Sequence, residues 1–235
     1  MKEQISYNDY LEATNDMLNA SQQEGLDHTI PFKGKSLTIQ KNVFSPKYFH
    51  DSRFFANKLP ITKGQSFLEI GPGCGIVSIA AALRGASRVL AIDSNLDAVW
   101  NTRENAKTYE VADKIEVRHG VVYTLYGEIE IEEQFDSIFW NVPFGYLPKG
   151  YKVSRLQKAV FDPGYKHIRE FIEGAPDHLK AEGKLHIGFS STLGIPELLE
   201  NRLTRTGFEH RIIARTKSRE KYPVSFELYE AKVRE

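Results

Sequence analysis

Two kinds of hydrophobic pattern alternate along most of the chain, and their order predicts the fold. Short runs that read as strands occur at residues 66–70, 88–93, 114–120, 135–140 and 183–190. Longer stretches with helical spacing of apolar residues follow most of them, at residues 76–85, 95–110, 165–181 and 194–207. Strands that alternate with helices form a parallel sheet covered by helices on both faces. The pattern therefore predicts an α/β fold.

The two ends of the chain depart from this alternation. Residues 209–216 and 225–233 read as two strands with no helix between them, which predicts an antiparallel hairpin at one edge of the sheet. Residues 6–23 predict a helix, and residues 29–43 a hairpin that turns at Lys33–Gly34. We therefore expect an N-terminal helix and hairpin extension over residues 1–44 and the main domain over residues 45–235.

Composition narrows the class of protein. A length of 235 residues suits one α/β domain with a short extension. Lys plus Arg and Asp plus Glu each number 31, and this balance argues against a wholesale nucleic-acid binder, although a local basic patch stays possible. A single cysteine, Cys74, excludes an internal disulfide. No signal-peptide core and no apolar run of about 18 residues is present, so we expect a cytoplasmic protein without membrane contact.

The segment "FLEIGPGCGIVSIAAA" carries the clearest chemistry. It is a strand, a turn with Gly71, Gly73 and Gly75, and then a helix. Glycine permits positive φ and close approach of a ligand to the main chain, and a helix N-terminus offers free N–H groups. Asp93 follows 18 residues after Gly75, at the end of the next strand, where a carboxylate can accept hydrogen bonds from ribose hydroxyls. A nucleotide cofactor is predicted.

The glycine spacing distinguishes two cofactors. A dinucleotide fingerprint needs a third glycine at position 76, which is Ile76. The spacing G-x-G-x-G after the acid Glu69 instead resembles motif I of the class I S-adenosylmethionine-dependent methyltransferases. The resemblance implies a Rossmann-like, seven-stranded, mostly parallel sheet. It places Glu69 near the amino-acid end of the cofactor, the glycines beside its sulfonium and ribose, Asp93 on the ribose diol, and Ser94 and the Val121 main chain nearby. The product would be S-adenosylhomocysteine.

A tetrapeptide after the fourth strand suggests the methylated atom. Asn141-Val142-Pro143-Phe144 resembles the Asn-Pro-Pro-Tyr/Phe motif of methyltransferases that modify planar nitrogens, including the HemK-like glutamine enzymes and the N6-adenine enzymes. In such a site the asparagine side-chain oxygen and the next main-chain carbonyl accept the two substrate N–H bonds. Pro143 stiffens the turn, and Phe144 offers a face to a planar group. Val142 departs from the motif's first proline but keeps the carbonyl.

Further resemblance favours the HemK-like, methyltransferase small domain group. "GKSLTIQKNVFSPKYF" is similar to the hairpin and Pro-containing loop before their cofactor site, and "AVFDPGYKHIREFI" to the segment after their tetrapeptide. The resemblance covers residues 34–235. The chain lacks the group's full N-terminal helical domain, which contributes to release-factor recognition, so a release factor is not assigned as substrate.

The segment from 145 to 169 adds a second candidate feature. It carries six basic residues against one acid and is predicted to be a mobile lid whose aromatic rings could stack on bases. The basic residues are Lys149, Lys152, Arg155, Lys158, Lys166 and Arg169, the acid is Asp162, and the aromatics are Tyr146, Tyr151, Phe161 and Tyr165.

The sequence thus predicts a methyltransferase that acts on an amide or amine nitrogen, with no metal site. Protein glutamine, a nucleic-acid adenine and a small molecule methylated on nitrogen or oxygen remain open as acceptors. A non-catalytic scaffold that has kept the methyltransferase fold is a further alternative.

Overall fold

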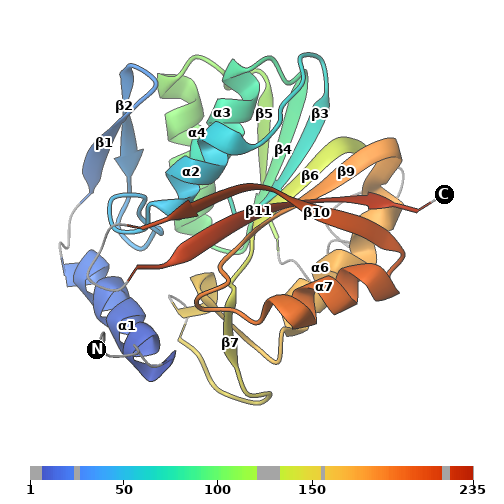
Figure 1. Cartoon of the computed structure of the whole chain (residues 1–235). Coiled ribbons are helices and arrows are strands. Elements are labelled where there is room, and N and C mark those ends of the chain that lie inside the picture. Colours follow the sequence, from blue (N-terminus) through green and yellow to red (C-terminus); the bar gives the residue numbers. More distant parts are fainter. Residues whose placement is uncertain (1–6, 24–26, 121–132, 155–156, 219–222, 235) are drawn as a thin grey trace.

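The structure is a computed structural model that describes residues 7–23, 27–120, 133–154, 157–218 and 223–234. A seven-stranded sheet forms its centre, with the strand order β10-β11-β9-β6-β3-β4-β5 (Figure 1). The strands are β3 (Ser66–Ile70), β4 (Arg88–Asp93), β5 (Ile115–His119), β6 (Phe135–Asn141), β9 (Leu179–Phe189), β10 (Phe208–Lys217) and β11 (Ser225–Val233). The first five are parallel, whereas β11 is antiparallel to β9 and β10 to β11. The predicted α/β fold with an antiparallel edge hairpin is confirmed.

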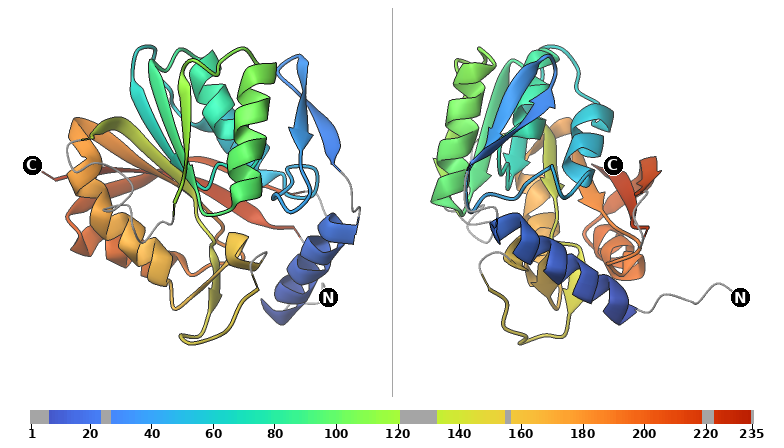
Figure 2. Two further views of the ribbon diagram at one scale, coloured as in Figure 1. Left: turned by 180° about the vertical axis from the view of Figure 1, so that it is seen from behind. Right: turned by 90° about the vertical axis from the view of Figure 1, so that its left-hand side faces the viewer.

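The direction of each connection between parallel strands determines which face of the sheet its helix covers. From β3 the chain passes through α3 (Ile76–Leu83) and α4 (Leu96–Thr108) to β4 and β5 on one side, and α6 (Lys166–Gly174) connects β6 to β9 on the other. Parallel connections are right-handed, so helices of oppositely directed connections cover opposite faces of the sheet. α2 (Asp51–Lys58) packs beside α3, and α7 (Pro196–Arg205) beside α6, as two separate groups (Figures 1 and 2). None of the described helices is long and apolar enough to cross a membrane.

The core is densest where α3 lies on the sheet. All residues of α3 from Ile76 to Ala82 are buried, and three of them are alanines that let the neighbouring backbones approach closely. Residues 67–70 of β3 are buried as well, because this strand is flanked by β4 and β6. The beginning of α3 is thereby fixed at the carboxyl end of the central strand.

The N-terminal hairpin is tied to the main domain. It consists of β1 (His28–Phe32) and β2 (Lys35–Ile39), and its turn residues Lys33 and Gly34 both have positive φ, as the predicted two-residue turn requires. The Asn105 side chain accepts a hydrogen bond from the Thr38 N–H (3.0 Å) and donates one to the Thr38 carbonyl (2.7 Å). The hairpin therefore rests on α4, while α1 (Tyr7–Gln23) lies below it, where Asn15 accepts a hydrogen bond from Gln157 (Figures 1 and 2).

The segment after the tetrapeptide is more ordered than its sequence pattern indicates. It forms two short parallel strands, β7 (Gly145–Leu147) and β8 (Phe161–Pro163), and a 3-10 turn, η2 (Gln157–Ala159). The Gly145 N–H donates to the Val160 carbonyl at 2.7 Å, and a Cβ on Gly145 would stand only 2.4 Å from the Phe161 ring. The expected helix over residues 165–181 ends at Gly174 and continues as η3 (Ala175–His178), because Pro176 cannot extend an α-helix.

A buried Ser–His–Glu arrangement crosses three strands of the sheet. The Ser137 hydroxyl lies 3.0 Å from His186 Nδ1, and His186 Nε2 lies 3.6 Å from a carboxylate oxygen of Glu230. The residue types match a hydrolytic triad, but Ser137 is only 2% exposed. Because a nucleophile needs contact with its substrate, this arrangement is a structural link between β6, β9 and β11.

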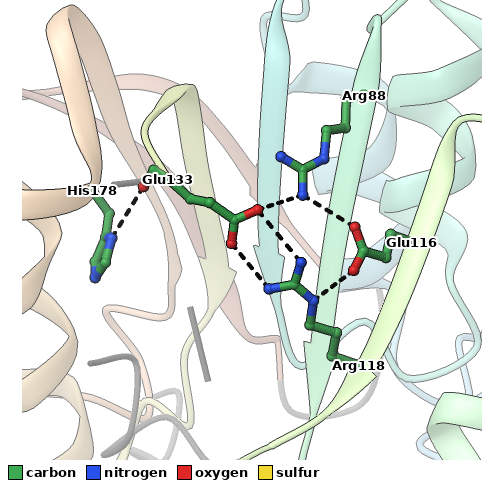
Figure 3. Close-up of polar contacts among 5 residues, drawn as sticks. All are labelled: Arg88, Glu116, Arg118, Glu133 and His178. Atoms are coloured by element: carbon green, nitrogen blue, oxygen red, sulfur yellow. Dashed lines mark hydrogen bonds and ion pairs between the residues drawn. The ribbon is translucent and has the colours of Figure 1, made fainter. Parts of the chain in front are cut away.

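An alternating network of four charges lies over β4, β5 and the start of β6 (Figure 3). Arg88 bonds both Glu116 (3.1 Å) and Glu133 (2.5 Å), and Arg118 bonds the same two carboxylates at 2.6 and 3.0 Å. The Glu133 side chain is 15% exposed, and its main-chain carbonyl accepts a hydrogen bond from His178. Burial alone would raise the pKa of Glu133, but the two arginines outweigh it and hold that pKa below its usual value. The network fastens the approach to β6 onto the sheet edge.

Glu133→Gln should lower the free energy of unfolding at pH 7 by about 1–2 kcal/mol, since it breaks charge-assisted hydrogen bonds that are partly shielded from water. A carboxyl group whose pKa is lowered by folding contributes stability above its unfolded pKa and loses it as pH falls. The difference between wild type and variant should therefore shrink toward pH 3. Denaturant unfolding of both proteins at pH 7 and at pH 3 measures this difference in the free energy of unfolding. Glu104→Gln, which removes the exposed ion pair with Lys107, is the matched control and should have almost no effect.

Candidate active site

A cavity of about 750 Å³ opens where β3, β4 and β6 end. Its walls come from the loops after these three strands, and they include Gly71, Pro72, Gly73, Asp93, Ser94, Asn95, Asn141 and Pro143. The strand order reverses between β3 and β6, and such a reversal opens a crevice at the carboxyl edge of a parallel sheet. The volume lies in the range of small-molecule sites. With Glu69, which also borders it, seven predicted contact residues from three separate segments line this one cavity.

The glycine loop has the backbone that its sequence predicts. Gly71, Gly73 and Gly75 have φ values of 63°, 59° and 82°, a region that favours glycine. A Cβ on Gly75 would come within 2.9 Å of the Thr102 side chain on α4, whereas one on Gly71 would meet the Trp140 ring nitrogen at 3.2 Å. Gly71 and Gly73 line the cavity, and Gly75 lies outside its lining, where it allows α3 and α4 to approach.

Asp93 connects the end of β4 to the glycine loop. One carboxylate oxygen accepts the Gly73 N–H at 3.1 Å and the other accepts the Asn95 N–H at 2.8 Å. Asn95 in turn caps α4 by accepting the Asp97 N–H. Asp93 thereby ties the glycine loop to the start of α4 at the wall of the cavity.

Glu69 is a buried carboxyl group at the inner end of the cavity. It is 3% exposed and accepts a short hydrogen bond from the Ser78 hydroxyl of α3. Burial raises its pKa to about 8 against the opposing effect of Ser78, and the nearby charge of Asp93 adds to the rise. Glu69 is therefore mostly protonated at neutral pH and is ready to ionise beside a cationic group.

The tetrapeptide begins at the last residue of β6. The Asn141 amide nitrogen donates to Asp51 at 2.8 Å, and its oxygen is buried with no donor among the described residues. The Val142 N–H donates to the Gly188 carbonyl at 3.2 Å, a bond that proline at this position would lack. No described residue donates to the Val142 carbonyl either.

Phe144 and Tyr165 fix the far end of the tetrapeptide. The Tyr165 hydroxyl donates to the Phe144 carbonyl at 2.7 Å and accepts the Ile195 N–H at 2.9 Å. The Phe144 ring packs edge-on against Phe189 and Phe226. These contacts hold Pro143 and Phe144 in place although they follow the end of the strand.

A second, smaller cavity of about 50 Å³ lies beyond Phe144. Phe44 and Ala159 line both cavities, so the two share a wall. The rest of the second lining is mostly apolar and comes from distant segments: Thr14, Met17, Tyr48, Phe49, His50, Asp51, Phe144, Val160, Leu193, Ser218, Val224 and Phe226. Asn141 and Asp51 thus stand between the two cavities.

The predicted lid contributes to the site in part. Val153, Lys158 and Ala159 line the larger cavity. Of the four aromatic residues expected to stack on bases, Phe161 and Tyr165 are buried, Tyr146 is half-buried, and Tyr151 is 59% exposed. Arg155 and the predicted adenine contact Val121 lie outside the described residues, although Gly120 borders the cavity.

Comparison with known families decides the class of enzyme. The family model described as methyltransferase small domain matches residues 35–218. The chain belongs to this family. It is therefore an S-adenosylmethionine-dependent methyltransferase, and its family implies S-adenosylmethionine as the methyl donor.

The similar proteins differ in the share of their own length that aligns with this chain. A Methanocaldococcus jannaschii protein whose name proposes a protein N5-glutamine methyltransferase is 32% identical over 192 residues, which cover 80% of this chain and 92% of the relative. Ribosomal RNA small subunit methyltransferase C of Photorhabdus laumondii is 31% identical over 152 residues, or 64% of this chain and only 38% of that protein.

Solved structures support the fold alone. The M. jannaschii tRNA m1G37 methyltransferase superposes with a TM-score of 0.60 at 16% identity, covering 89% of this chain and 57% of that one. A ribosomal protein L11 methylase from Lactobacillus delbrueckii gives 0.54 at 18% identity, covering 87% and 81%. The methyltransferase therefore has the predicted architecture.

Three residues of the site were absent from the sequence-based prediction or had a different role there. Asp51 has the appearance of an ordinary helix-start residue, and Trp140 that of a core residue of β6. Tyr165 was expected to stack on substrate, but its hydroxyl anchors the tetrapeptide. Their hydrogen bonds and packing join segments 21 to 90 residues apart, and no local pattern signals them.

Glu69→Gln should weaken S-adenosylmethionine binding by about 1–3 kcal/mol, because the proposed partner of the cofactor's ammonium group loses its charge. Only ionised Glu69 attracts that ammonium. Wild-type affinity should therefore rise between pH 5.5 and 7.5, and the variant should lose this rise; calorimetry measures both. 5′-Methylthioadenosine lacks the amino-acid tail and should bind both proteins equally. Equal loss for both ligands would remove Glu69 from the tail site.

The stability of the unliganded protein gives an independent test of the raised pKa of Glu69. A carboxyl group whose folded pKa is raised makes the native state bind more protons, so its contribution to stability falls as pH rises from about 4.5 to 8. Unliganded Glu69→Gln should therefore be more stable than wild type at pH 8, and the difference should vanish near pH 4 in thermal unfolding.

Proposed function

We propose that the protein methylates the side-chain amide nitrogen of a glutamine residue in a protein substrate. The observation that carries the proposal is the Asn141 carboxamide at the cavity wall, whose buried oxygen has no donor among the described residues. Buried acceptors are seldom left unpaired, so such an oxygen is suited to an incoming N–H. The name of the M. jannaschii relative supports the same substrate class.

A primary amide needs two acceptors, one for each of its N–H bonds. The Asn141 oxygen and the Val142 carbonyl are adjacent in the chain, and no described residue donates to either. Acceptors at these two positions would orient the nitrogen and stabilise positive charge as it develops there. Phe144 would border the acceptor group.

When bound, S-adenosylmethionine supplies an electrophilic methyl group on a sulfonium sulfur. We assign its contacts to Glu69, Gly71, Gly73, Gly75, Asp93, Ser94 and Val121. The acceptor nitrogen gains the methyl group, the carbon–sulfur bond breaks to leave a neutral thioether, and the nitrogen loses one proton to water. The residues of the tetrapeptide act by holding the nitrogen and its two N–H bonds in place.

The burial of Phe161 and Tyr165 favours an amide over a nucleobase, because it removes two of the rings that base stacking would use. We further propose that residues 1–44 form an extension to the domain at 45–235, and that α1 helps to select the acceptor through Thr14 and Met17.

Asn141→Ala should lower turnover by about 10²–10³ while S-adenosylhomocysteine affinity stays unchanged, because one oriented polar group leaves the reacting site. Transfer of a tritiated methyl group into fractionated extract measures turnover, and mass spectrometry of the labelled protein identifies the modified residue. Unchanged turnover would show that the tetrapeptide is only a turn. Label in RNA or small molecules would exclude the glutamine assignment.

Reversing the exposed charges Lys149→Glu and Lys152→Glu tests the nucleic-acid alternative. If the acceptor is a protein amide, labelling of extract protein should change less than threefold, since neither side chain lines either cavity. An RNA-modifying enzyme would lose RNA binding, and wild-type binding would fall steeply with salt. A gel-shift series at increasing salt separates the two results.

A further inference from the structure

Asp51 is a buried carboxyl group with little to balance its charge. It begins α2, is 2% exposed, and forms no ion pair with any described Lys or Arg side chain. One oxygen accepts the Ser52 N–H at 2.8 Å, and the other accepts the Asn141 amide nitrogen. Desolvation of an ion in such a place is costly, so a buried carboxyl group beside a cavity points to a role beyond packing.

The carboxylate dictates which way the Asn141 carboxamide faces. An ionised carboxylate only accepts hydrogen bonds, so the group at 2.8 Å from Asp51 must be the NH₂ and the oxygen must lie on the other side. That oxygen lies over Gly188, where a Cβ would stand 3.0 Å from it. A flipped carboxamide would offer an NH₂ to the substrate amide and could not accept its N–H.

Asp51 and Asn141 also lie where Asp51 can orient the Asn141 carboxamide without contacting the substrate. Asn141 lines the larger cavity and Asp51 the smaller one, so their hydrogen bond crosses the partition between them. The other titratable side chains that share the smaller cavity are Tyr48 and His50. Burial raises the pKa of Asp51, and hydrogen bonds from Asn141 and Ser52 and the charge of His50 oppose the rise.

We propose that Asp51 is a positioning residue that holds the Asn141 carboxamide with its oxygen available to the acceptor nitrogen. This inference rests on the proposed function of the tetrapeptide. Asp51 acts through Asn141 and needs no contact with substrate. Protonated Asp51 can itself donate a hydrogen bond, which removes the preference for one orientation of the carboxamide.

A double-mutant cycle tests this coupling. Asp51→Asn can face Asn141 with either an oxygen or an NH₂, and it should lower kcat about 10- to 100-fold with unchanged affinity for S-adenosylhomocysteine. In the Asn141→Ala background the same change should cost nothing, because the group that it orients is absent. Turnover is the transfer of tritiated methyl into the protein fraction that wild type labels. An equal loss in both backgrounds would overturn the inference.

Stability and pH separate positioning from a general effect on folding. Asp51→Asn removes a poorly compensated buried charge and should be at least as stable as wild type at pH 8 in thermal unfolding. At saturating cofactor, kcat of wild type should fall on the acid side at a pH above the ordinary aspartate range, and Asp51→Asn should lack this limb. The same limb in the variant would contradict the proposal. If Asn141→Ala alone has no effect, the proposed function fails; if only Asp51→Asn has none, the positioning role fails.

Discussion

The site depends on one topological constraint, the reversal of strand order between β3 and β6. Connections that leave β3 and β6 in opposite directions cannot cover the carboxyl ends of both strands, and a crevice results. The glycine loop after β3 and the tetrapeptide after β6 therefore face one cavity, although about 70 residues separate them. The dense packing of α3 over β3 fixes the loop, since a side chain on Gly75 would collide with α4. The proposed cofactor and acceptor sites therefore adjoin at this point for geometric reasons.

The sequence predicted those parts of the site that local pattern determines. A strand, a glycine turn and a helix within 18 residues make a self-contained unit, and the start of β3, β4 and α3 agreed with the prediction. The region from 145 to 169 was expected to be a mobile lid with little pattern, yet residues 145–147 and 161–163 form two short strands, because Gly145 lets the backbone lie against Phe161 and Val160. Contacts of that kind join residues with no shared periodicity, so the pattern does not reveal them.

Buried carboxyl groups differ in whether a cationic side chain balances their charge. Glu133 is partly buried too, but two arginines neutralise it and keep its pKa low. Glu69 and Asp51 border the cavities without such partners, and their pKa values are raised. A buried carboxyl group without a cationic partner destabilises the folded chain when it is ionised. A bound cationic ligand or a hydrogen-bonded amide offsets part of this loss of stability. Both of these acids border a cavity in which the proposed function places a ligand.

The two cavities also differ in where their residues come from, and this difference explains why the cofactor was easier to predict than the acceptor. Most of the larger cavity is drawn from the continuous stretch between residues 69 and 120. The smaller one combines residues from α1, the loop before α2, the tetrapeptide, β11 and the loops beside it. If the smaller cavity takes the acceptor, as proposed, substitutions in α1 or in the loop before α2 should alter acceptor selection while the glycine loop and Asp93 stay unchanged. Asn141 and Asp51 join the two halves, so a change in either one should affect transfer without affecting cofactor retention.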